Sequence, residues 1–291
     1  MIDLLRLVIA GVMIGSIYSL IGLGFSLTYS GTGLINWAQG ELYMIGAFLA
    51  WTLLSLFGLP FIIALPVALA ILFALGAGTY LGPVRFVTNR GGRFVEILLL
   101  TIGLSFLLRN GAEVIWGSTI LTVPNIIPGM FTFGSAAFPR LYVVVLGVAV
   151  IAVISLFLFL SRTGFGTAMR ASADNPYAAV IVGVPVRKVN AVSWGIAAAV
   201  AGLAGFLISP LFGALSIMGL FAGLKGFVAA VVGGFGNPRG ALLGGLLLGV
   251  TETLVTAYVS SQLKDVVAMI LLIIFLVLRP QGLLKSTAVA A

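Results

Sequence analysis

Apolar residues form long runs along this chain, separated by short polar stretches. The uninterrupted runs cover residues 4–27, 61–81, 94–112, 141–160, 189–208, 240–259 and 266–278. A helix needs roughly 20 mostly apolar residues to cross a bilayer, and most of these runs approach that length. Two further runs, 29–58 and 216–235, are apolar but interrupted by glycine and polar residues. The pattern predicts an all-α polytopic membrane protein of about eight transmembrane segments, some broken or re-entrant.

The composition leads to the same class of protein. Of the 291 residues, 61% are hydrophobic and only 8% are charged, whereas an ordinary soluble domain has about 25% charged residues. A soluble fold of this size cannot hide so much apolar surface from water, so the chain needs lipid around it. No polar block is long enough to fold alone, and we expect residues 1–291 to form a single transmembrane domain.

The positive charges indicate how the segments are oriented. The net charge is +8, but the basic residues stand at the ends of apolar runs, which is typical of cytoplasmic loops rather than of a nucleic-acid surface. Loops 82–93 and 162–188 and the C-terminus are therefore expected on the cytoplasmic side. Residues 113–139 contain no Lys or Arg, and this stretch up to Arg140 is expected outside as a folded cap or short strands. The side of the N-terminus depends on whether a segment before Arg162 is re-entrant, and both arrangements stay open.

The first interrupted run is a candidate substrate pathway. Several polar or aromatic residues crowd its start: Asn36, Trp37, Gln39, Glu41 and Tyr43. Non-helical backbone at membrane depth is tolerated only where protein or a water-filled cavity covers it. One interpretation is a broken helix that lines a pathway. The alternative is a loop at the membrane surface, with Trp37 and Tyr43 as interfacial anchors.

Other ionisable residues also lie within apolar sequence. Lys225 and Glu252 are expected to face the interior of the bundle, either as a structural pair or as contacts for substrate. The run that contains Lys225, residues 216–235, either spans as a broken helix or dips in and returns. Glu96 and Arg109 lie too far apart on one helix to pair with each other, and we expect both to mark the ends of a span.

The loop 162–188 is the longest polar interruption. Within it, Asn175 suits an N-cap, Pro176 the first helical position and Gly183 the C-terminal stop, so a short helix over 176–182 is predicted. An amphipathic helix lying on the membrane surface is one possibility. A rigid docking element for a cytoplasmic partner is the other.

The sequence lacks the residues and motifs that metal binding, catalysis and ATP binding usually require. The chain has no Cys and no His, which removes disulfides, the commonest metal ligands and the usual catalytic pairs, so we expect no metal, no cofactor and no enzymatic activity. No G-x-x-x-x-G-K-[ST] motif occurs, so the chain is not expected to bind ATP through a P-loop. Residues 233–240, GGFGNPRG, could cradle a phosphate, but a tight turn is the simpler interpretation.

Four stretches of the sequence resemble one transporter family. GTAMRASADNPYAAVIVGVPVRKV resembles the coupling loop of the permease subunits of ABC importers for branched-chain amino acids. IYSLIGLGFSLTYSGTGLINWAQGELYMIGAF, LKGFVAAVVGGFGNPRGALLGGLLLGVTE and RPQGLL resemble the other family signatures, in the expected order and over nearly the whole chain, with the shorter H-type permease as the nearest subunit.

The resemblance implies a larger assembly in a bacterial inner membrane. It implies a second permease subunit, two cytoplasmic ATPase subunits and a periplasmic or extracellular binding protein that delivers substrate. The residues that would lie on or beside the coupling helix are Arg170, Asp174, Asn175, Pro176, Ala178, Ala179 and Gly183.

One departure from the family pattern bears on the substrate. The family often has Asn-Phe-Ala-His-Gly where this chain has Asn36-Trp37-Ala38-Gln39-Gly40, and related permeases carry urea, short amides and other amino acids. A stand-alone secondary transporter or channel, coupled to ions through Glu41, Lys225 or Glu252, is the second class considered.

Overall fold

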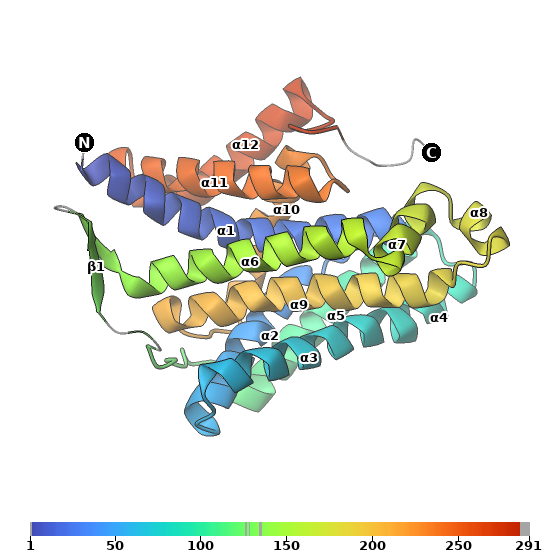
Figure 1. Ribbon diagram of the computed structural model, residues 1–291, viewed down its shortest axis with the longest axis horizontal. Helices are drawn as coiled ribbons and strands as arrows, with labels where there is room; N and C mark the ends of the chain where they lie inside the picture. The colour runs from blue at the N-terminus through green and yellow to red at the C-terminus, as the bar shows by residue number, and fades with distance from the viewer. Residues whose placement is uncertain (1, 126, 128, 134–135, 286–291) are drawn as a thin grey trace.

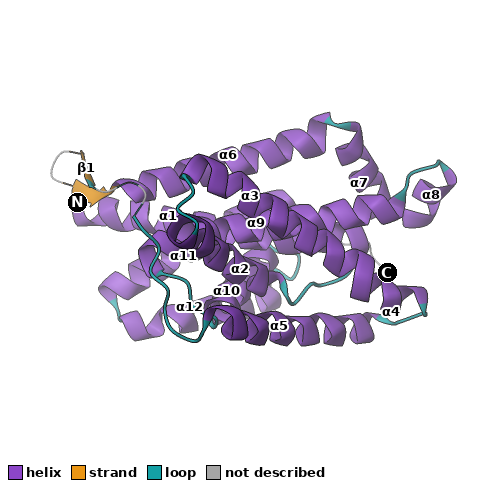
Figure 2. Cartoon of the chain, turned by 90° about the horizontal axis from the view of Figure 1, so that it is seen from below, coloured by secondary structure: helices purple, strands orange, loops and turns teal. Residues whose placement is uncertain are grey.

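The computed structural model describes residues 2–125, 127, 129–133 and 136–285, and nearly all of them are helical (Figures 1 and 2). The main helices are α1 (Ile2–Thr32), α2 (Gln39–Trp51), α3 (Phe61–Thr79), α5 (Phe94–Trp116), α6 (Arg140–Arg162), α9 (Val186–Phe212), α10 (Met218–Gly233), α11 (Pro238–Tyr258) and α12 (Lys264–Leu278). The shorter elements are the π-helical turns η1 (Thr52–Leu56) and η2 (Tyr80–Val84), the helices α4 (Arg85–Asn89), α7 (Gly164–Asp174) and α8 (Pro176–Ile181), and the 3₁₀ turn η3 (Ser261–Leu263).

The predicted fold class is confirmed. Within the described residues, seven helical stretches are long and apolar enough to cross a membrane, and α10 adds a shorter apolar helix. Together these agree with the expected count of about eight segments.

The long helices lie side by side along the long axis of the molecule, so the bundle has two distinct ends (Figure 1). One end carries the β-hairpin and the start of α1, and the other carries α4, α7 and α8. Most Lys and Arg residues belong to elements that end or begin at the α8 end: Arg85, Arg90, Arg93, Arg162, Arg170, Arg187, Lys188, Arg239, Arg279 and Lys285. This asymmetry is what positive charges on cytoplasmic loops would produce.

The two halves of the chain have the same order of helices, but the helices of the second half run in the opposite direction. Helix α1 is followed by the non-helical residues 33–38 and the short helix α2, which runs toward the β-hairpin end. Helix α9 is antiparallel to α1, and residues 213–217 and the short helix α10 follow it, running toward the α8 end. The contacts repeat as well, because α1 packs on α11 and α10 while α9 packs on α3 and α2. Inverted repeats of this kind are common in transporters, and the sequence reasoning did not detect this one.

Glycines let the central helices approach each other closely. A methyl group added at Gly249 would collide with the backbone of Gly15, which joins α11 to α1. One added at Gly205 would collide with the carbonyl of Tyr43, which joins α9 to α2. Small residues are favoured at such contacts because backbones in a membrane associate mainly through close packing.

A proline commonly ends a helix, but α9 continues past Pro210 to Phe212. The missing N–H of a proline leaves the carbonyl of Phe206 without its helical partner, and the hydroxyl of Ser209 donates to that carbonyl at 2.9 Å instead.

The glycine-rich run 216–235 does not contain a broken helix. Helix α10 is continuous, because its glycines lie against neighbouring helices: Gly223 against Gly40, Gly226 against Ile21 and Gly233 against Gly240. Tertiary packing overrides the low helix propensity of these glycines. Its 16 residues are too few to span a bilayer, so the interruption lies before the helix, at residues 213–217.

The expected short strands after α5 are confirmed. Strands β1 (Met130–Phe133) and β2 (Ala136–Pro139) pair as an antiparallel hairpin, with Met130 opposite Pro139. Glu113 is not part of this cap, because α5 extends to Trp116. The chain from 117 then runs across the bundle end, where Leu121 and Ala214 form an isolated β-bridge.

Candidate functional site

The break between α1 and α2 is folded inside the protein. Gly33 has φ of +67°, a value that favours glycine, and the chain turns back there from the end of α1. The side-chain oxygen of Asn36 accepts a hydrogen bond from the N–H of Ala38 at 3.1 Å. The amide nitrogen of Gln39 donates to the carbonyl of Ala197 on α9 at 2.8 Å. Asn36, Gln39 and Glu41 are all buried, so the break lies inside the protein and the surface-loop alternative is wrong, while a role in lining a pathway stays a prediction.

The two aromatic residues of this segment are not simple interfacial anchors. The backbone N–H of Trp37 donates to Thr101 Oγ1 at 3.2 Å, and its ring packs against Phe227 on α10 with centroids 5.6 Å apart. Tyr43 is buried on α2. Both side chains therefore belong to the interior surfaces of the bundle.

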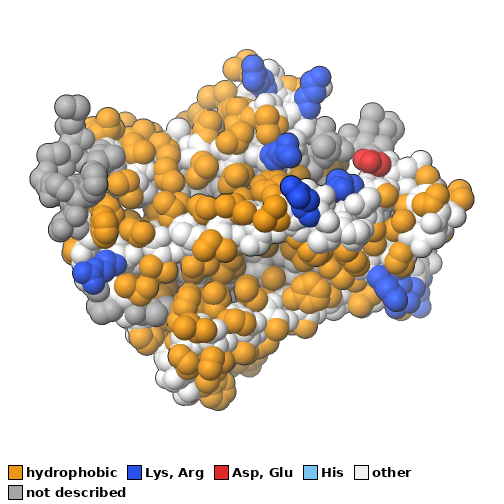
Figure 3. All heavy atoms as spheres, viewed as in Figure 1, with side chains coloured by type: hydrophobic (Ala, Val, Ile, Leu, Met, Phe, Trp, Pro, Cys, Tyr) orange, Lys and Arg blue, Asp and Glu red, His pale blue; other side chains and the backbone are white. Residues whose placement is uncertain are grey.

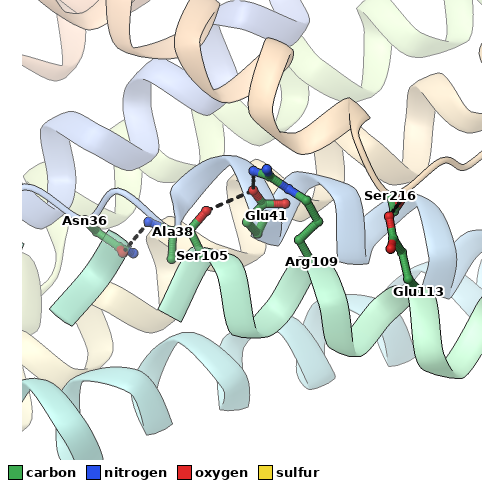
Figure 4. A network of polar contacts seen from close by, with 7 residues as sticks. All are labelled: Asn36, Ala38, Glu41, Ser105, Arg109, Glu113 and Ser216. Carbon is green, nitrogen blue, oxygen red and sulfur yellow. Dashed lines mark hydrogen bonds and ion pairs between the residues drawn. The ribbon is translucent and has the colours of Figure 1, made fainter. Parts of the chain in front are cut away.

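Glu41 is the charged centre of the site (Figure 4). Its Oε1 accepts hydrogen bonds from Ser105 Oγ at 2.9 Å and from Arg109 Nη2, both on α5. Glu41 is only 1% exposed. Gly219 lies against its carboxylate, and no side chain larger than hydrogen would fit there. The expectation that Arg109 marks the end of a span is therefore wrong: Arg109 reaches inward because it neutralises a buried acid.

Helix α5 presents a row of polar residues at four-residue spacing. Thr101, Ser105, Arg109 and Glu113 lie on one face of the helix. The last of them accepts a hydrogen bond from Ser216 Oγ at 2.7 Å (Figure 4). This row forms hydrogen bonds with both non-helical segments, residues 33–38 and residues 213–217. The spacing was visible in the sequence, but its partners lie more than 60 residues away.

A narrow crevice opens beside Glu41, between α5 and α10. Trp37, Gly40, Glu41, Ser105 and Phe227 are among its lining residues. Its volume of about 20 Å³ is enough for a single water molecule. Glu41 makes one side of the crevice charged, and the other sides are mainly apolar. The first turns of α2 and α10 meet there.

A second charged cluster lies around α10. Lys225 Nζ is 2.6 Å from Glu252 Oε1 on α11, so the predicted pair is confirmed. Lys225 Nζ is also 2.8 Å from Asp265 Oδ1 at the start of α12, a partner that the sequence reasoning missed. Residues 234–237, by contrast, form the simple turn that was expected between α10 and α11, and the side chain of Asn237 caps α11.

The short helix predicted over 176–182 is present as α8. Asn175 Oδ1 accepts from the N–H of Ala178 at 2.9 Å, Pro176 occupies the first turn, and Gly183 has φ of +84°. A second helix that the sequence reasoning missed, α7, precedes it with Thr163 as its N-cap. Arg170 on α7 donates to the carbonyl of Leu160, at the end of α6.

The exposed face of α8 is apolar. The helix lies at one end of the molecule (Figure 1), and hydrophobic side chains are visible on the surface at that end (Figure 3). Tyr177 is 86% exposed and Ile181 85% exposed, whereas Ala179 is buried by its own chain. Asp174, Asn175, Pro176 and Ala178 are exposed as well. Among the described residues, no three His, Cys, Asp or Glu side chains come together as a metal site would require.

These features define an integral membrane protein with a buried ion pair beside a break between two helices and an apolar helix exposed at its basic end. Residues 7–276 match the family of the permease component of the branched-chain amino acid transport system, and the chain belongs to that family.

Relatives across nearly the full length agree with this assignment. The chain is 36% identical to the high-affinity branched-chain amino acid transport system permease protein BraD of Pseudomonas aeruginosa, covering 96% of this chain and 95% of that protein. It is 34% identical to the corresponding permease protein LivH of Escherichia coli K12, covering 94% of this chain and 93% of that protein. It is 29% identical to LivM of the same organism, covering 93% of this chain and 68% of that protein.

A solved structure shares the fold. PsaBC from Streptococcus pneumoniae in complex with Fab superposes with a TM-score of 0.53 over 95% of this chain and 91% of that chain. The two sequences are 13% identical, so the likeness concerns the fold alone.

Proposed function

We propose that this chain is the transmembrane permease subunit of an ATP-driven ABC importer that moves branched-chain or related amino acids inward by alternating access. The family membership supports the transport role. The two opposed halves and their half-length helices α2 and α10 support alternating access, because such halves can rock against one another around a fixed central site. The expected location is the bacterial cell membrane.

The observation that carries the proposal is the crevice beside Glu41. It is lined by the carboxylate of Glu41, which is paired with Arg109, and by Ser105 of α5, whose hydroxyl donates to that carboxylate. A charged lining is costly to expose to lipid, so such a crevice is covered by protein or filled with water. We propose that the second permease subunit covers it and that substrate passes between the two subunits. Both LivH and LivM relatives exist in one organism, which favours a heterodimer.

Within this pathway the predicted residues take different roles. Trp37 and Glu41 line the crevice and are proposed to contact the pathway directly. Asn36 and Gln39 shape the break, because their amides bind each other and the backbone. Tyr43, Lys225 and Glu252 line a different cavity. The departure from the family motif at Gln39 therefore concerns the scaffold, and Trp37 is the position that bears on urea or short amides as alternative substrates.

Reconstitution into liposomes tests the proposal. The chain is incorporated together with a second permease subunit and the ATPase subunits, with the binding protein outside. ATP-dependent leucine uptake is expected from the complete system and none from the chain alone. Uptake by the chain alone without ATP would instead establish a secondary transporter or channel. ATP-dependent uptake of urea or acetamide instead of leucine would assign a different substrate class, and the proposed mechanism would still hold.

We further propose that the exposed face of α8 docks on an ATPase subunit. The replacement Ile181→Asp is expected to lower ATP-dependent uptake at least tenfold and to leave the thermal stability of the chain unchanged, because Ile181 makes little contact within this chain. Ile120→Asp, at the opposite end of the molecule and also exposed, is the control and is expected to transport normally. Equal uptake by both variants would contradict the docking role. Ala179→Asp is unsuitable for this test, because it would place a charge in the buried interior of the loop.

A further inference from the structure

A second cavity lies within the subunit and is not part of the proposed pathway. Its volume is about 330 Å³, within the range of about 300–1,000 Å³ that ligand pockets occupy. Lys225 lines this cavity, whereas Gly223 and Leu224 line the crevice beside Glu41. Residues two apart on a helix point to nearly opposite sides. Helix α10 therefore separates the two spaces.

The walls of this cavity are mostly apolar, although Tyr18, Tyr43, Thr253 and Thr256 also line it. Ile14 and Ile17 come from α1, and Ile208 and Phe212 come from the last turns of α9. Branched aliphatic side chains on two facing helices give a surface that suits an aliphatic ligand group.

One end of the cavity is ionic. Lys225 Nζ is held by Glu252 Oε1 and Asp265 Oδ1. The other oxygen of Glu252, Oε2, is buried and has no hydrogen-bond partner among the described residues. The hydroxyl of Tyr18 lines the same cavity and interacts with the Glu252 carboxylate, and a carboxylate oxygen can accept a further donor. The cavity also contains Lys264, which forms no ion pair within the described part of the chain.

We propose that this cavity binds a free aliphatic amino acid. Its ammonium group donates to Glu252 Oε2, its carboxylate lies toward Lys264, and its side chain packs between Ile17 and Ile208. An aliphatic zwitterion matches each part: a carboxylate oxygen that can accept a further hydrogen bond, a lysine without an ion pair among the described residues and a mainly apolar wall. The inference rests on the proposed amino-acid transport and adds a binding station that α10 separates from the crevice beside Glu41.

Equilibrium binding of radiolabelled L-leucine tests this site. The full transporter complex is placed in nanodiscs without ATP and without the binding protein. Three variants are compared with the parent. Glu252→Gln removes the negative oxygen while Lys225 keeps Asp265 as its partner. Thr256→Trp fills the cavity from an exposed position on α11. Leu243→Trp, also exposed on α11 but outside the cavity, is the matched control.

We expect saturable leucine binding by the parent and by Leu243→Trp, affinity lowered at least tenfold by Glu252→Gln, and binding abolished by Thr256→Trp. N-acetyl-L-leucine, which lacks the ammonium, is expected not to compete. The inference is overturned if Glu252→Gln and Thr256→Trp bind leucine like the parent, or if N-acetyl-L-leucine competes equally.

ATP-driven uptake by the same preparations separates this inference from the proposed function. Normal uptake by the parent without ATP-independent leucine binding overturns the cavity site alone. Absence of uptake from the complete system, with leucine binding that Thr256→Trp abolishes, overturns the transport proposal and supports the site.

Discussion

In the first half of the chain, the short helix α2 carries an acid, Glu41, and a base on α5 neutralises it. In the second half, the short helix α10 carries a base, Lys225, and acids on α11 and α12 neutralise it. The two clusters occupy corresponding elements of the opposed halves, because α5 follows α2 and α3 as α12 follows α10 and α11. The arrangement of helices is repeated, but the buried charge on the short helix is negative in the first half and positive in the second.

The clusters also differ in how closely they are packed. Glu41 is sealed by Gly219, Ser105 and Arg109, beside a crevice of about 20 Å³. Lys225 faces a cavity of about 330 Å³, and the side chain of Asp265 is 54% exposed. The same fold therefore supports one closed and one open ionic site. We expect the closed site, which borders the proposed pathway, to contribute more to the stability of the chain than the open one does.

The largest effect is expected from removing one partner of the closed pair. Arg109→Met leaves Glu41 charged, buried and without its base. Breaking a buried pair in this way costs about 3–5 kcal/mol. We expect a sharp loss of folded protein, measured as the yield of monodisperse chain in detergent and the midpoint of thermal unfolding.

The double variant Glu41→Gln/Arg109→Met is the control, because it removes both charges together. It is expected to recover most of the lost stability, since replacing both members of a buried pair is often nearly neutral. If the double variant were as unstable as Arg109→Met, the harm would come from lost packing rather than from an unpaired charge.

A smaller effect is expected from closing the space beneath Glu41. Gly219→Ala places a methyl group against the Glu41 carboxylate and the carbonyl of Gly40. Overpacking of this kind costs about 1–3 kcal/mol. Gly103→Ala on α5 meets no atom within 4 Å and is expected to be neutral or slightly stabilising. Equal unfolding midpoints for the two variants would show that the closed site has room to relax.

The sequence was sufficient for the fold class, because apolar runs of span length have few alternatives to membrane helices. It was also sufficient for α8, since Asn175, Pro176 and Gly183 act through their own backbone neighbours. The pairing of Lys225 with Glu252 was predictable because few ionisable residues lie within apolar sequence, and each needs a partner there.

The remaining features depend on contacts between distant parts of the chain. Arg109 was assigned to a helix end because its partner, Glu41, lies 68 residues earlier. The continuity of α10 depends on glycines that pack against α1, α2 and α11, and helix propensity alone predicts the opposite. The inverted repeat was undetected because it preserves the path of the backbone while the charges exchange places.

The smallest expected effect is found within a matched pair of substitutions, one in each cluster. Ser105→Ala removes one of the two donors to Glu41 Oε1 and leaves Arg109 in place, and a hydrogen bond to a charged group contributes about 1.5–3 kcal/mol. Asp265→Asn weakens a half-exposed ion pair, and such pairs contribute about 0–1 kcal/mol. Thermal unfolding in one detergent should therefore show the larger decrease for Ser105→Ala. The reverse order would mean that the open site stabilises the bundle more than the closed one does, and this expectation would be wrong.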